Sequence, residues 1–322
     1  MRKISILMSI YNETIDQIVE SIMSILHQTF SEFELIIVLD SPERDISDLI
    51  QGFHDERIVF IRNSKNMGLA LSMNRAASLS STKILARMDA DDVALQNRLE
   101  VEYNILVNNN IDFVFSNYNT IDGDSKIIEE SSIQEDFSNP EELRMSVSLA
   151  PSIIHHPTVM FTKSLFEKVG GYRNFPCAQD SDLWLRMAEA GCRFYKVGTP
   201  LLNYRINPNS ITNKRWFLQQ LTGHYILTLS MERLEKGVDS FSSENYQRFL
   251  NSNGINSLEE YNRLKRSTEL LRRAKLLKKE GCSLLASILR VRVFFMSAIY
   301  RKSFLLSYKK KIKLKYGSDN NS

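Results

Sequence analysis

The first half of the chain alternates two patterns of apolar residues. Near-continuous apolar runs, typical of strands buried on both faces, occupy residues 4–10, 33–39, 57–62 and 83–88. Apolar residues at helical spacing lie between them, in residues 14–28, 45–53 and 68–80. Strands and helices in this order predict a parallel sheet with helices on both faces.

A second region follows, from about residue 113 to 210. Strand-like runs occur at residues 112–118 and 157–161, and a helical pattern runs from Asp180 to Gly191. The acidic start of this helix suits the helix dipole, and the glycine is a natural C-terminal cap. Gly170 and Gly171 precede the helix and predict a turn that brings Tyr172 and Arg173 toward a site.

Charge is distributed unevenly along the 322 residues. From Tyr261 onward there are 17 Lys and Arg against 3 Asp and Glu, a balance of +14, which leaves −11 for residues 1–260. The chain becomes helical and basic from about Ile211. Cys177, Cys192 and Cys282 are odd in number and lack metal-ligand spacing, which favours reduced thiols in a cytosolic setting. The N-terminal apolar run is short and lacks a cleavage site, so we interpret it as a strand, not a signal peptide.

The residues that follow the four runs are the candidates for ligand binding. In such sheets, ligands bind outside the carboxyl ends of the strands. The polar residues at these positions are Ser9, Tyr11, Asn12, Asp40, Ser41, Asn63, Asn66, Asp89, Asp91 and Asp92. Neither G-x-G-x-x-G nor a Walker A motif occurs in the chain, which disfavours a dinucleotide or P-loop site.

Three aspartates crowd the end of the fourth run. Asp89, Asp91 and Asp92 raise one another's pKa unless a cation joins them. Oxygen ligands suit Mn²⁺ or Mg²⁺, which are usually held by one or two carboxylates and substrate phosphates. The alternative is a solvated, turn-forming cluster. The buried strand before it, and Asp40 at a second strand end, favour a metal bound together with a diphosphate.

Six segments resemble the family 2 glycosyltransferases, which transfer sugars from nucleotide-sugar donors with inversion. In order, they are "ISILMSIYNE", "SILHQTFSEFELIIVLDS", "NSKNMGLALSMNRAA", "ARMDADD", "GGYR" with "AQDSDLWLRMAEAG", and "LLNYRINPNSIT". The resemblance implies the GT-A nucleotide-diphospho-sugar transferase fold, a doubly wound mixed sheet. We expect a GT-A domain at residues 1–212, with a nucleotide-binding half (about 1–112) and an acceptor half (about 113–212), and a helical basic region at residues 213–322.

The resemblance also assigns roles in donor binding. Ser9, Tyr11 and Asp40 resemble the residues that hold the uridine of a UDP-sugar. Asp89 and Asp91 resemble the two acids of the D-x-D motif, one near the ribose and the other on the metal and diphosphate. Asp92 is a second candidate metal ligand. The implied cofactor is Mn²⁺ or Mg²⁺.

Asp180 resembles the catalytic base of the family. A hydroxyl of the acceptor attacks the anomeric carbon while the diphosphate departs, so a base is needed on the acceptor side and a cation on the other. His156 and Trp184 are possible acceptor contacts, against structural roles for both. On a helix, Asp182 points away from Asp180, so we predict that it caps the helix or forms a salt bridge.

Three positions depart from the family pattern. Ser9 stands where Pro is common, and Leu39 replaces the first of two acids, which leaves Asp40 alone. Asn207 replaces a His thought to approach the diphosphate or metal, and an amide carries no positive charge. Asn207 is therefore a possible diphosphate contact that gives weaker assistance to the leaving group.

The basic tail, residues 281–316, has no uncharged run long enough to cross a bilayer. Its mixture of apolar and basic residues favours an amphipathic helix on an anionic membrane surface. The alternative is a solvated helical face packed on the catalytic domain. Because no nucleic-acid-binding motif accompanies the charge, we expect no nucleic-acid partner. We expect peripheral association with the cytoplasmic face of the bacterial inner membrane.

The sequence thus predicts a metal-dependent inverting transferase that moves a hexose or N-acetylhexosamine from a UDP-sugar to a glycan acceptor. The acceptor implied by the resemblance is a polyprenyl-diphosphate-linked saccharide of lipopolysaccharide O-antigen or capsule synthesis. One alternative is a sugar-1-phosphate nucleotidyltransferase, but the expected Gly-rich loop is missing near the N-terminus. The other is a non-catalytic subunit that binds a nucleotide or glycan.

Overall fold

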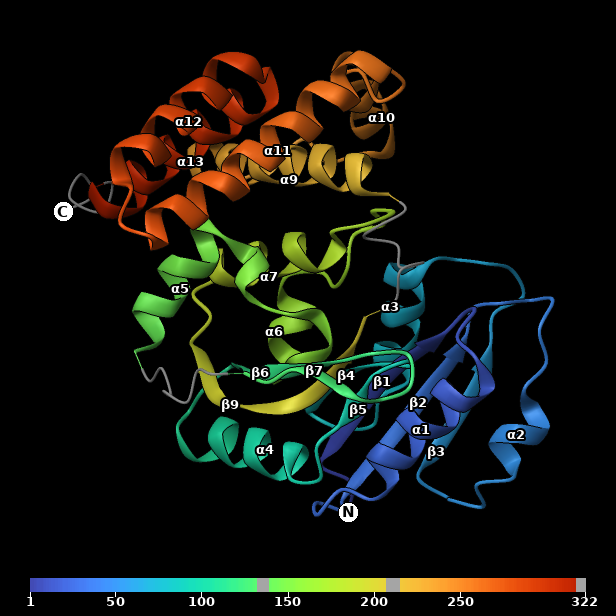
Figure 1. The fold of residues 1–322 in the computed structure, drawn as a ribbon. Coiled ribbons are helices and arrows are strands. Elements are labelled where there is room, and N and C mark those ends of the chain that lie inside the picture. Colours follow the sequence, from blue (N-terminus) through green and yellow to red (C-terminus); the bar gives the residue numbers. More distant parts are fainter. Residues whose placement is uncertain (132–138, 207–214, 317–322) are drawn as a thin grey trace. The chain divides into compact units, whose positions relative to one another are not determined.

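The computed structural model describes residues 1–131, 139–206 and 215–316 (Figure 1). The chain forms two compact units, residues 1–210 and 211–322. The boundary predicted at residues 212 and 213 lies outside the described ranges.

The first unit is an α/β structure built on one sheet. Its strands are β1 (Ile4–Ile10), β2 (Phe33–Leu39), β3 (Ile58–Arg62), β4 (Ile84–Asp89), β5 (Val93–Ala94), β6 (Phe113–Ile121), β7 (Ile127–Glu129), β8 (Val159–Thr162) and β9 (Phe194–Arg205). Its α-helices are α1 (Ile15–Leu26), α2 (Ser47–Gln51), α3 (Leu69–Leu79), α4 (Arg98–Asn108), α5 (Pro140–Leu149), α6 (Lys163–Lys168) and α7 (Gln179–Glu189).

The strand order is β3-β2-β1-β4-β8-β6-β9-β5, and β7 pairs with β6. Strands β3, β2, β1 and β4 are parallel, β8 runs antiparallel between β4 and β6, and β9 is parallel to β6. The predicted doubly wound mixed sheet is therefore confirmed. Strands β1 and β2 have the bounds that the apolar runs predicted. Every residue in both is buried, which explains why their sequences are almost continuously apolar.

Helices cover both faces of this sheet (Figure 1). Alternate side chains of β1 and β2 enter two different cores, as the twofold period of a strand requires. One core contains apolar residues of α1, α2 and α4, and the other contains those of α3, α5, α6 and α7. The two cores fix the positions of the strand ends, and hence of the sheet edge at which we expect the ligand to bind.

Strand β9 is the main element that the apolar pattern did not predict. It includes Lys196, Gly198 and Pro200, and its register against β6 shifts between Ser116 and Tyr118. Gly and Pro interrupt a strand pattern and mark an irregular ladder. This strand matters for the site because it ends at Arg205.

The second unit is helical, as predicted. It contains α9 (Trp216–Lys236), α10 (Ser243–Ser252), α11 (Leu258–Lys279), α12 (Ser283–Met296) and α13 (Ala298–Tyr316). Within the described chain, no single helix has the length and apolar composition to cross a membrane. Helices α12 and α13, which meet at a bend of 111°, pass that test when they are taken together.

Candidate active site

The carboxyl ends of the parallel strands form one edge, as predicted. Ser9 is in register with Asp89 across β1 and β4, and Ile10 is in register with Leu39 across β1 and β2. Leu39 in turn pairs with Arg62 of β3. The polar residues that follow these strands are thereby brought to the same end of the sheet.

The acidic turn, residues 89–92, follows β4 directly. Asp92 is fully buried, and its Oδ1 accepts a hydrogen bond from the Arg205 backbone N–H at 2.9 Å. The Arg205 Nε donates to the Asp91 carbonyl oxygen at 2.7 Å. Asp92 Oδ2 is buried and has no hydrogen-bond partner among the described residues. The turn is thus fixed from β9, and one carboxylate oxygen is left unsatisfied.

Arg205 is 2% exposed, and its guanidinium is fully used. Nη1 donates to the carbonyl oxygens of Asp122 and Gly123 at 2.9 and 3.0 Å. Nη2 donates to Glu20 Oε2 at 2.5 Å and to Ser125 Oγ at 3.0 Å. No role for Arg205 was predicted from the sequence, although it lies in the segment "LLNYRINPNSIT" that resembles the family. It positions the acidic turn.

Burial and mutual repulsion dominate the electrostatics of the turn. Burial, reinforced by the negative charges of Asp89 and Glu13, raises the pKa of Asp91 to about 7. Burial and the charges of Asp89 and Asp91 raise the pKa of Asp92 well above its usual value. A cation at this position would relieve the repulsion, as the sequence analysis argued.

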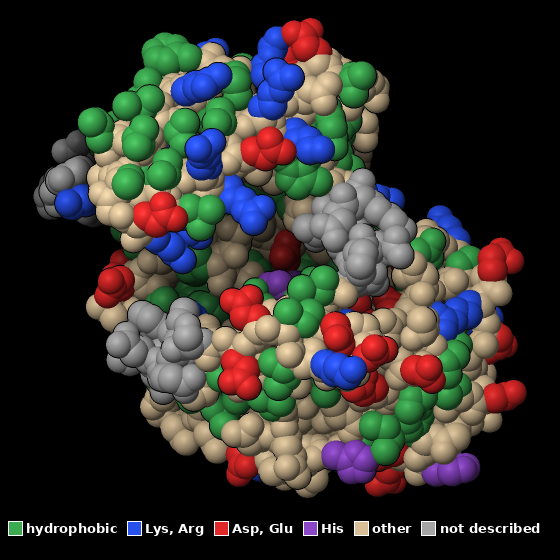
Figure 2. Space-filling model, viewed as in Figure 1, with side chains coloured by type: hydrophobic (Ala, Val, Ile, Leu, Met, Phe, Trp, Pro, Cys, Tyr) green, Lys and Arg blue, Asp and Glu red, His purple; other side chains and the backbone are tan. Residues whose placement is uncertain are grey.

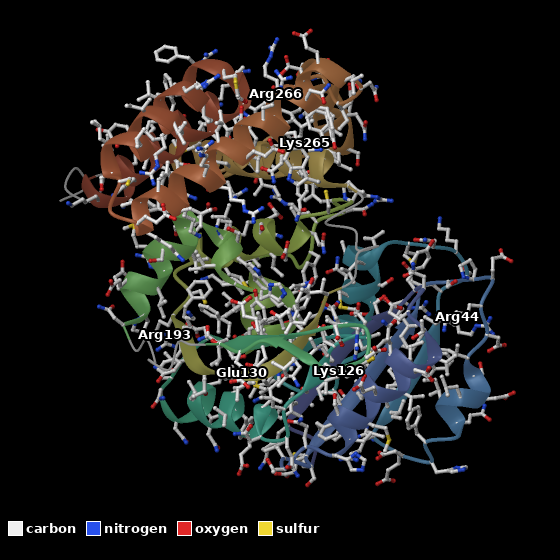
Figure 3. All side chains as sticks on the ribbon, in the orientation of Figure 1. Arg44, Lys126, Glu130, Arg193, Lys265 and Arg266 are labelled. Carbon is white, nitrogen blue, oxygen red and sulfur yellow. The ribbon has the colours of Figure 1, made fainter. Side chains whose placement is uncertain are left out.

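Glu13 is a fourth carboxylate near the turn, and the sequence analysis missed it. Its Oε2 accepts the Tyr11 backbone N–H at 2.7 Å, and burial raises its pKa, with a further contribution from Asp89. The Arg44 Nη1 donates to the Glu13 carbonyl oxygen at 2.7 Å, and Figure 3 labels this arginine. The signal available was its place in "SIYNE", directly after the first strand.

The donor set fits a hard divalent cation in part. Among the described residues, no group of three or more His, Cys, Asp or Glu side chains is arranged to hold a metal ion. The orphaned Asp92 Oδ2 and the half-buried Asp91 carboxylate are oxygen donors of the kind that Mn²⁺ and Mg²⁺ accept. Such ions need only one or two carboxylates when phosphates complete the shell.

Asp40, a predicted uridine contact, lies at the same edge but is already bonded. It is 3% exposed. Its Oδ1 accepts hydrogen bonds from Asn63 Nδ2 at 2.7 Å and Met67 N at 2.8 Å, and its Oδ2 accepts one from Gly68 N at 2.8 Å. In this structure Asp40 fixes the loop that leads into α3. Its contact with a nucleotide stays a prediction.

The other two predicted uridine contacts differ in exposure. Tyr11 is 47% exposed beyond the end of β1, whereas Ser9 is buried beside Asp89. The Tyr11 ring is therefore open to a ligand, and the Ser9 side chain is close to the acidic turn through its strand register.

Asp180 lies in the first turn of α7, and its side chain is partly exposed. Among the described residues, its carboxylate accepts one hydrogen bond, from the Ser181 backbone N–H at 2.8 Å. Burial raises its pKa, and the charge of Asp89 adds to the effect while that of Arg87 opposes it. Asp180 and Asp89 therefore lie within electrostatic reach of each other. The residue before the helix, Ala178, has the left-handed φ of 56°.

Arg87 is the buried cation between these carboxylates, and the sequence analysis missed it. Its side chain is 1% exposed and forms an ion pair with Asp89. It also opposes the rise in the pKa of Asp92 and Asp180. A lone Arg inside an apolar strand run was the signal that could have identified it.

The predicted glycine turn is confirmed. Gly170 and Gly171 have φ of 78° and 67°, and a Cβ on Gly171 would lie 2.8 Å from Asn74 Oδ1. The turn places the Tyr172 hydroxyl 2.8 Å from His156 Nε2. His156 and Tyr172 thus form a hydrogen-bonded pair, and the charge of Asp89 reaches both.

The prediction that Trp184 could contact an acceptor is wrong, because its side chain is buried. The side chain is 0% exposed and packs edge-on against Phe113 at 4.8 Å between ring centroids, so it belongs to the core. Asp182 is also buried and pairs with Arg186 at 2.8 Å, which confirms the predicted salt bridge. Arg186 further donates to the Gly171 carbonyl oxygen at 2.8 Å. Asn207 lies outside the described residues.

Comparisons with known proteins agree with this architecture. The model of glycosyl transferase family 2 matches residues 5–170. The structure of S. aureus TarS 1–349 in complex with UDP-GlcNAc superposes with a TM-score of 0.61 at 14% identity, and the match covers 98% of this chain and 92% of that chain. This likeness shows the fold, including the mixed sheet and the helical C-terminal region.

Three relatives are similar in sequence. An uncharacterized glycosyltransferase of Methanocaldococcus jannaschii is 32% identical over 232 residues, 70% of this chain and 78% of the relative. The Escherichia coli O-antigen biosynthesis glycosyltransferase WbnJ is 31% identical over 64% of this chain and 81% of its own. The E. coli UDP-Glc:alpha-D-GlcNAc-diphosphoundecaprenol beta-1,3-glucosyltransferase WfgD is 28% identical over 66% and 81%. The chain therefore belongs to glycosyl transferase family 2.

Proposed function

We propose that this glycosyltransferase moves a hexose or N-acetylhexosamine from a UDP-sugar to a glycan acceptor, with inversion at the anomeric carbon. One observation carries the proposal. Asp89 at the end of β4 and Asp180 at the start of α7 come from opposite halves of the first unit, yet the charge of one raises the pKa of the other. A single site thus has an acidic donor side and a carboxylate base.

Asp180 is the proposed base. Its raised pKa makes it a stronger proton acceptor than an ordinary aspartate, and one backbone hydrogen bond leaves its second oxygen available. The oxygen of the acceptor hydroxyl would bond to the anomeric carbon, its proton would pass to Asp180, and the bond from that carbon to the UDP oxygen would break. A base in such a position typically contributes about 10²- to 10⁴-fold to the rate.

The acidic turn is the proposed site of the cation and the diphosphate. Asp91 and Asp92 would hold Mn²⁺ or Mg²⁺, with Asp89 near the ribose. When bound, the cation supplies positive charge that stabilises the departing diphosphate. Arg205 keeps the turn in one conformation, since it bonds to the backbone of Asp91 and the carboxylate of Asp92. Tyr11 and Ser9 would contact the uridine.

The substrate classes are supported by the names of similar proteins. TarS was solved with UDP-GlcNAc, and WfgD is named for transfer from UDP-Glc to a GlcNAc-diphosphoundecaprenol. WbnJ is named for O-antigen biosynthesis. We propose a lipid-diphosphate-linked saccharide as the acceptor here, in the synthesis of a surface polysaccharide such as O antigen or capsule.

A transfer assay tests the proposal. The full chain with Mn²⁺ is offered UDP-, GDP- and dTDP-sugars and a synthetic lipid-diphosphate GlcNAc acceptor. We expect turnover with a UDP-sugar, and its loss in Asp180→Asn and in Asp91→Asn. Calorimetry of UDP with and without Mn²⁺ separates the two roles, because Asp91→Asn should lose the Mn²⁺-dependent part of binding and Asp180→Asn should keep it. Turnover unchanged in both variants would refute the assignment.

A further inference from the structure

Helix α12 carries a continuous row of exposed apolar side chains. The row consists of Leu284, Ile288, Val291 and Phe295, which are 77%, 54%, 57% and 73% exposed. Their spacing of four, three and four residues places them on one face of the helix. The opposite face, with Ala286 and Val293, is buried in the helical unit. Packing within the described structure therefore accounts for the apolar residues on one face of α12. The apolar residues on the other face are not covered by any described residue.

Helix α13 carries a second row of the same kind. Phe304, Leu305, Tyr308 and Ile312 are 61%, 51%, 59% and 42% exposed. The two rows meet at Phe294, whose ring lies 5.5 Å from that of Phe295 and 5.8 Å from that of Phe304. Eight large exposed apolar side chains on two adjoining helices far exceed the scattered exposure that is normal on a protein surface.

Helices α12 and α13 carry basic residues and no acidic ones. Residues 283–316 contain nine Lys and Arg and no Asp or Glu. Lys309 and Lys313 pair with Glu235 of α9, and Lys310 is buried. The exposed basic residues Arg290, Arg292, Lys302 and Lys311 have no ion-pair partner in the described part of the chain. Figure 2 shows hydrophobic and basic side chains intermixed on the helical unit.

We propose that the α12–α13 face, defined by these two apolar rows and the four unpaired basic residues, binds the surface of an anionic lipid bilayer. An interfacial helix inserts its apolar side chains among the acyl chains while its Lys and Arg meet the anionic headgroups. Both parts are present here on the same two helices. The charge complementarity favours a lipid surface over a second copy of this chain, whose corresponding face is equally basic and would repel it.

Vesicle flotation tests this inference on the full chain, without donor or acceptor, so that its outcome is independent of the proposed reaction. We expect binding to phosphatidylcholine vesicles that contain about 30% phosphatidylglycerol, and much weaker binding to neutral ones. The variant Leu284→Ser, Ile288→Ser, Phe295→Ser should bind at least about tenfold more weakly, since three inserting side chains are lost. All three are exposed, so circular dichroism should show an unchanged fold.

A second variant separates this face from diffuse charge attraction. Arg290→Gln with Arg292→Gln should weaken binding about fivefold for each residue removed, as expected for cations near an anionic surface. The matched control is Lys265→Gln with Arg266→Gln, two exposed residues of α11 that Figure 3 labels. The control should bind nearly as well as the unaltered chain. Equal losses in the two pairs would overturn the assignment to α12–α13.

Two further outcomes would also overturn it. One is full vesicle binding by the triple serine variant. The other is a dimer of the unaltered chain that the same three substitutions dissociate while vesicle binding is unaffected, which would make a second copy the occupant. Sedimentation velocity over a range of protein concentrations measures the second outcome.

Discussion

The acidic turn and the first turn of α7 hold their carboxylates in different ways. Among the described residues, Arg205 makes six hydrogen bonds, and two of them reach the acidic turn, from its backbone N–H to Asp92 and from its Nε to the Asp91 carbonyl oxygen. Asp180 accepts one hydrogen bond among the described residues, from the neighbouring backbone. A group that holds an ion needs a fixed position, whereas a base must be free to bond to its substrate. The two arrangements match these two demands.

The largest expected effect is on kcat, and it distinguishes the proposed base in α7 from the acidic turn. Asp180→Asn removes the proposed base and keeps the shape of the side chain, so kcat should fall about 10²- to 10⁴-fold. UDP binding and thermal stability should change little, because the side chain has few bonds to lose. Steady-state kinetics, calorimetry and a melting curve measure the three quantities. A loss of UDP affinity as large as the loss in kcat would contradict the separation.

The next effect concerns stability. Arg205→Gln removes the buried guanidinium that donates to the carbonyl oxygens around the turn and pairs with the partly exposed Glu20. The backbone N–H that bonds to Asp92 is kept. Because several acceptors lose their donor at once, the free energy of unfolding should fall by about 2–4 kcal/mol. The matched control is Arg193→Gln, which Figure 3 labels. Arg193 bonds to both oxygens of Asp112, but its side chain is 41% exposed, so its loss should cost at most about 1 kcal/mol. Urea denaturation measures the free energy of unfolding of both variants. Equal losses would show that the buried hydrogen bonds of Arg205 contribute no more stability than the exposed ion pair of Arg193.

A smaller effect is the pH dependence of the reaction. Asp180 must be ionised to accept a proton, and burial raises its pKa above the usual value of 3.8. The rate should therefore fall as pH decreases through this raised pKa, about tenfold for each pH unit below it. A pH–rate profile with saturating donor measures it. A rate that is constant down to pH 3.8, the usual pKa of an aspartate, would be inconsistent with a raised pKa.

The smallest effect concerns the backbone before Asp180. Ala178 has a left-handed φ of 56°, which costs a residue with a Cβ about 1–2 kcal/mol. Ala178→Gly relieves this cost but adds freedom to the unfolded chain, so we expect a net gain of about 0.5 kcal/mol. The melting temperature should rise slightly and kcat should stay within about twofold. A lower melting temperature would mean that the methyl group of Ala178 contributes packing.

The sequence predicted the elements whose pattern is local. Strands β1 and β2 were predicted at their observed bounds because their residues are apolar and buried on both faces. The placement of Ser9 and Asp89 at one edge of the sheet followed from the predicted parallel order of the strands. The salt bridge of Asp182, observed with Arg186 four residues later, is one of the two roles that local helix geometry predicted for it.

The sequence did not predict the contacts that depend on long-range packing. Arg87 and Arg205 look like ordinary charged residues in the chain, and their burial beside the acidic turn depends on neighbours far away in sequence. Trp184 could face a pocket or the core, and only the packing of α7 on β6 and β8 decided between them. The hydrogen bonds that Asp40 accepts from the backbone N–H groups of Met67 and Gly68 also depend on packing, and they were not predicted, whereas its contact with a nucleotide stays a prediction.

The hydrogen bond between Arg205 and Asp92 joins residues 113 positions apart, which sets an order for synthesis. At about 5–20 residues per second, the ribosome releases the acidic turn many seconds before it releases the arginine that satisfies it. A nascent chain that stops at residue 112 would therefore expose three crowded aspartates and an unpaired strand edge. We therefore expect that residues 1–112 do not fold stably alone, and that a polypeptide cut before residue 205 depends on chaperones or aggregates.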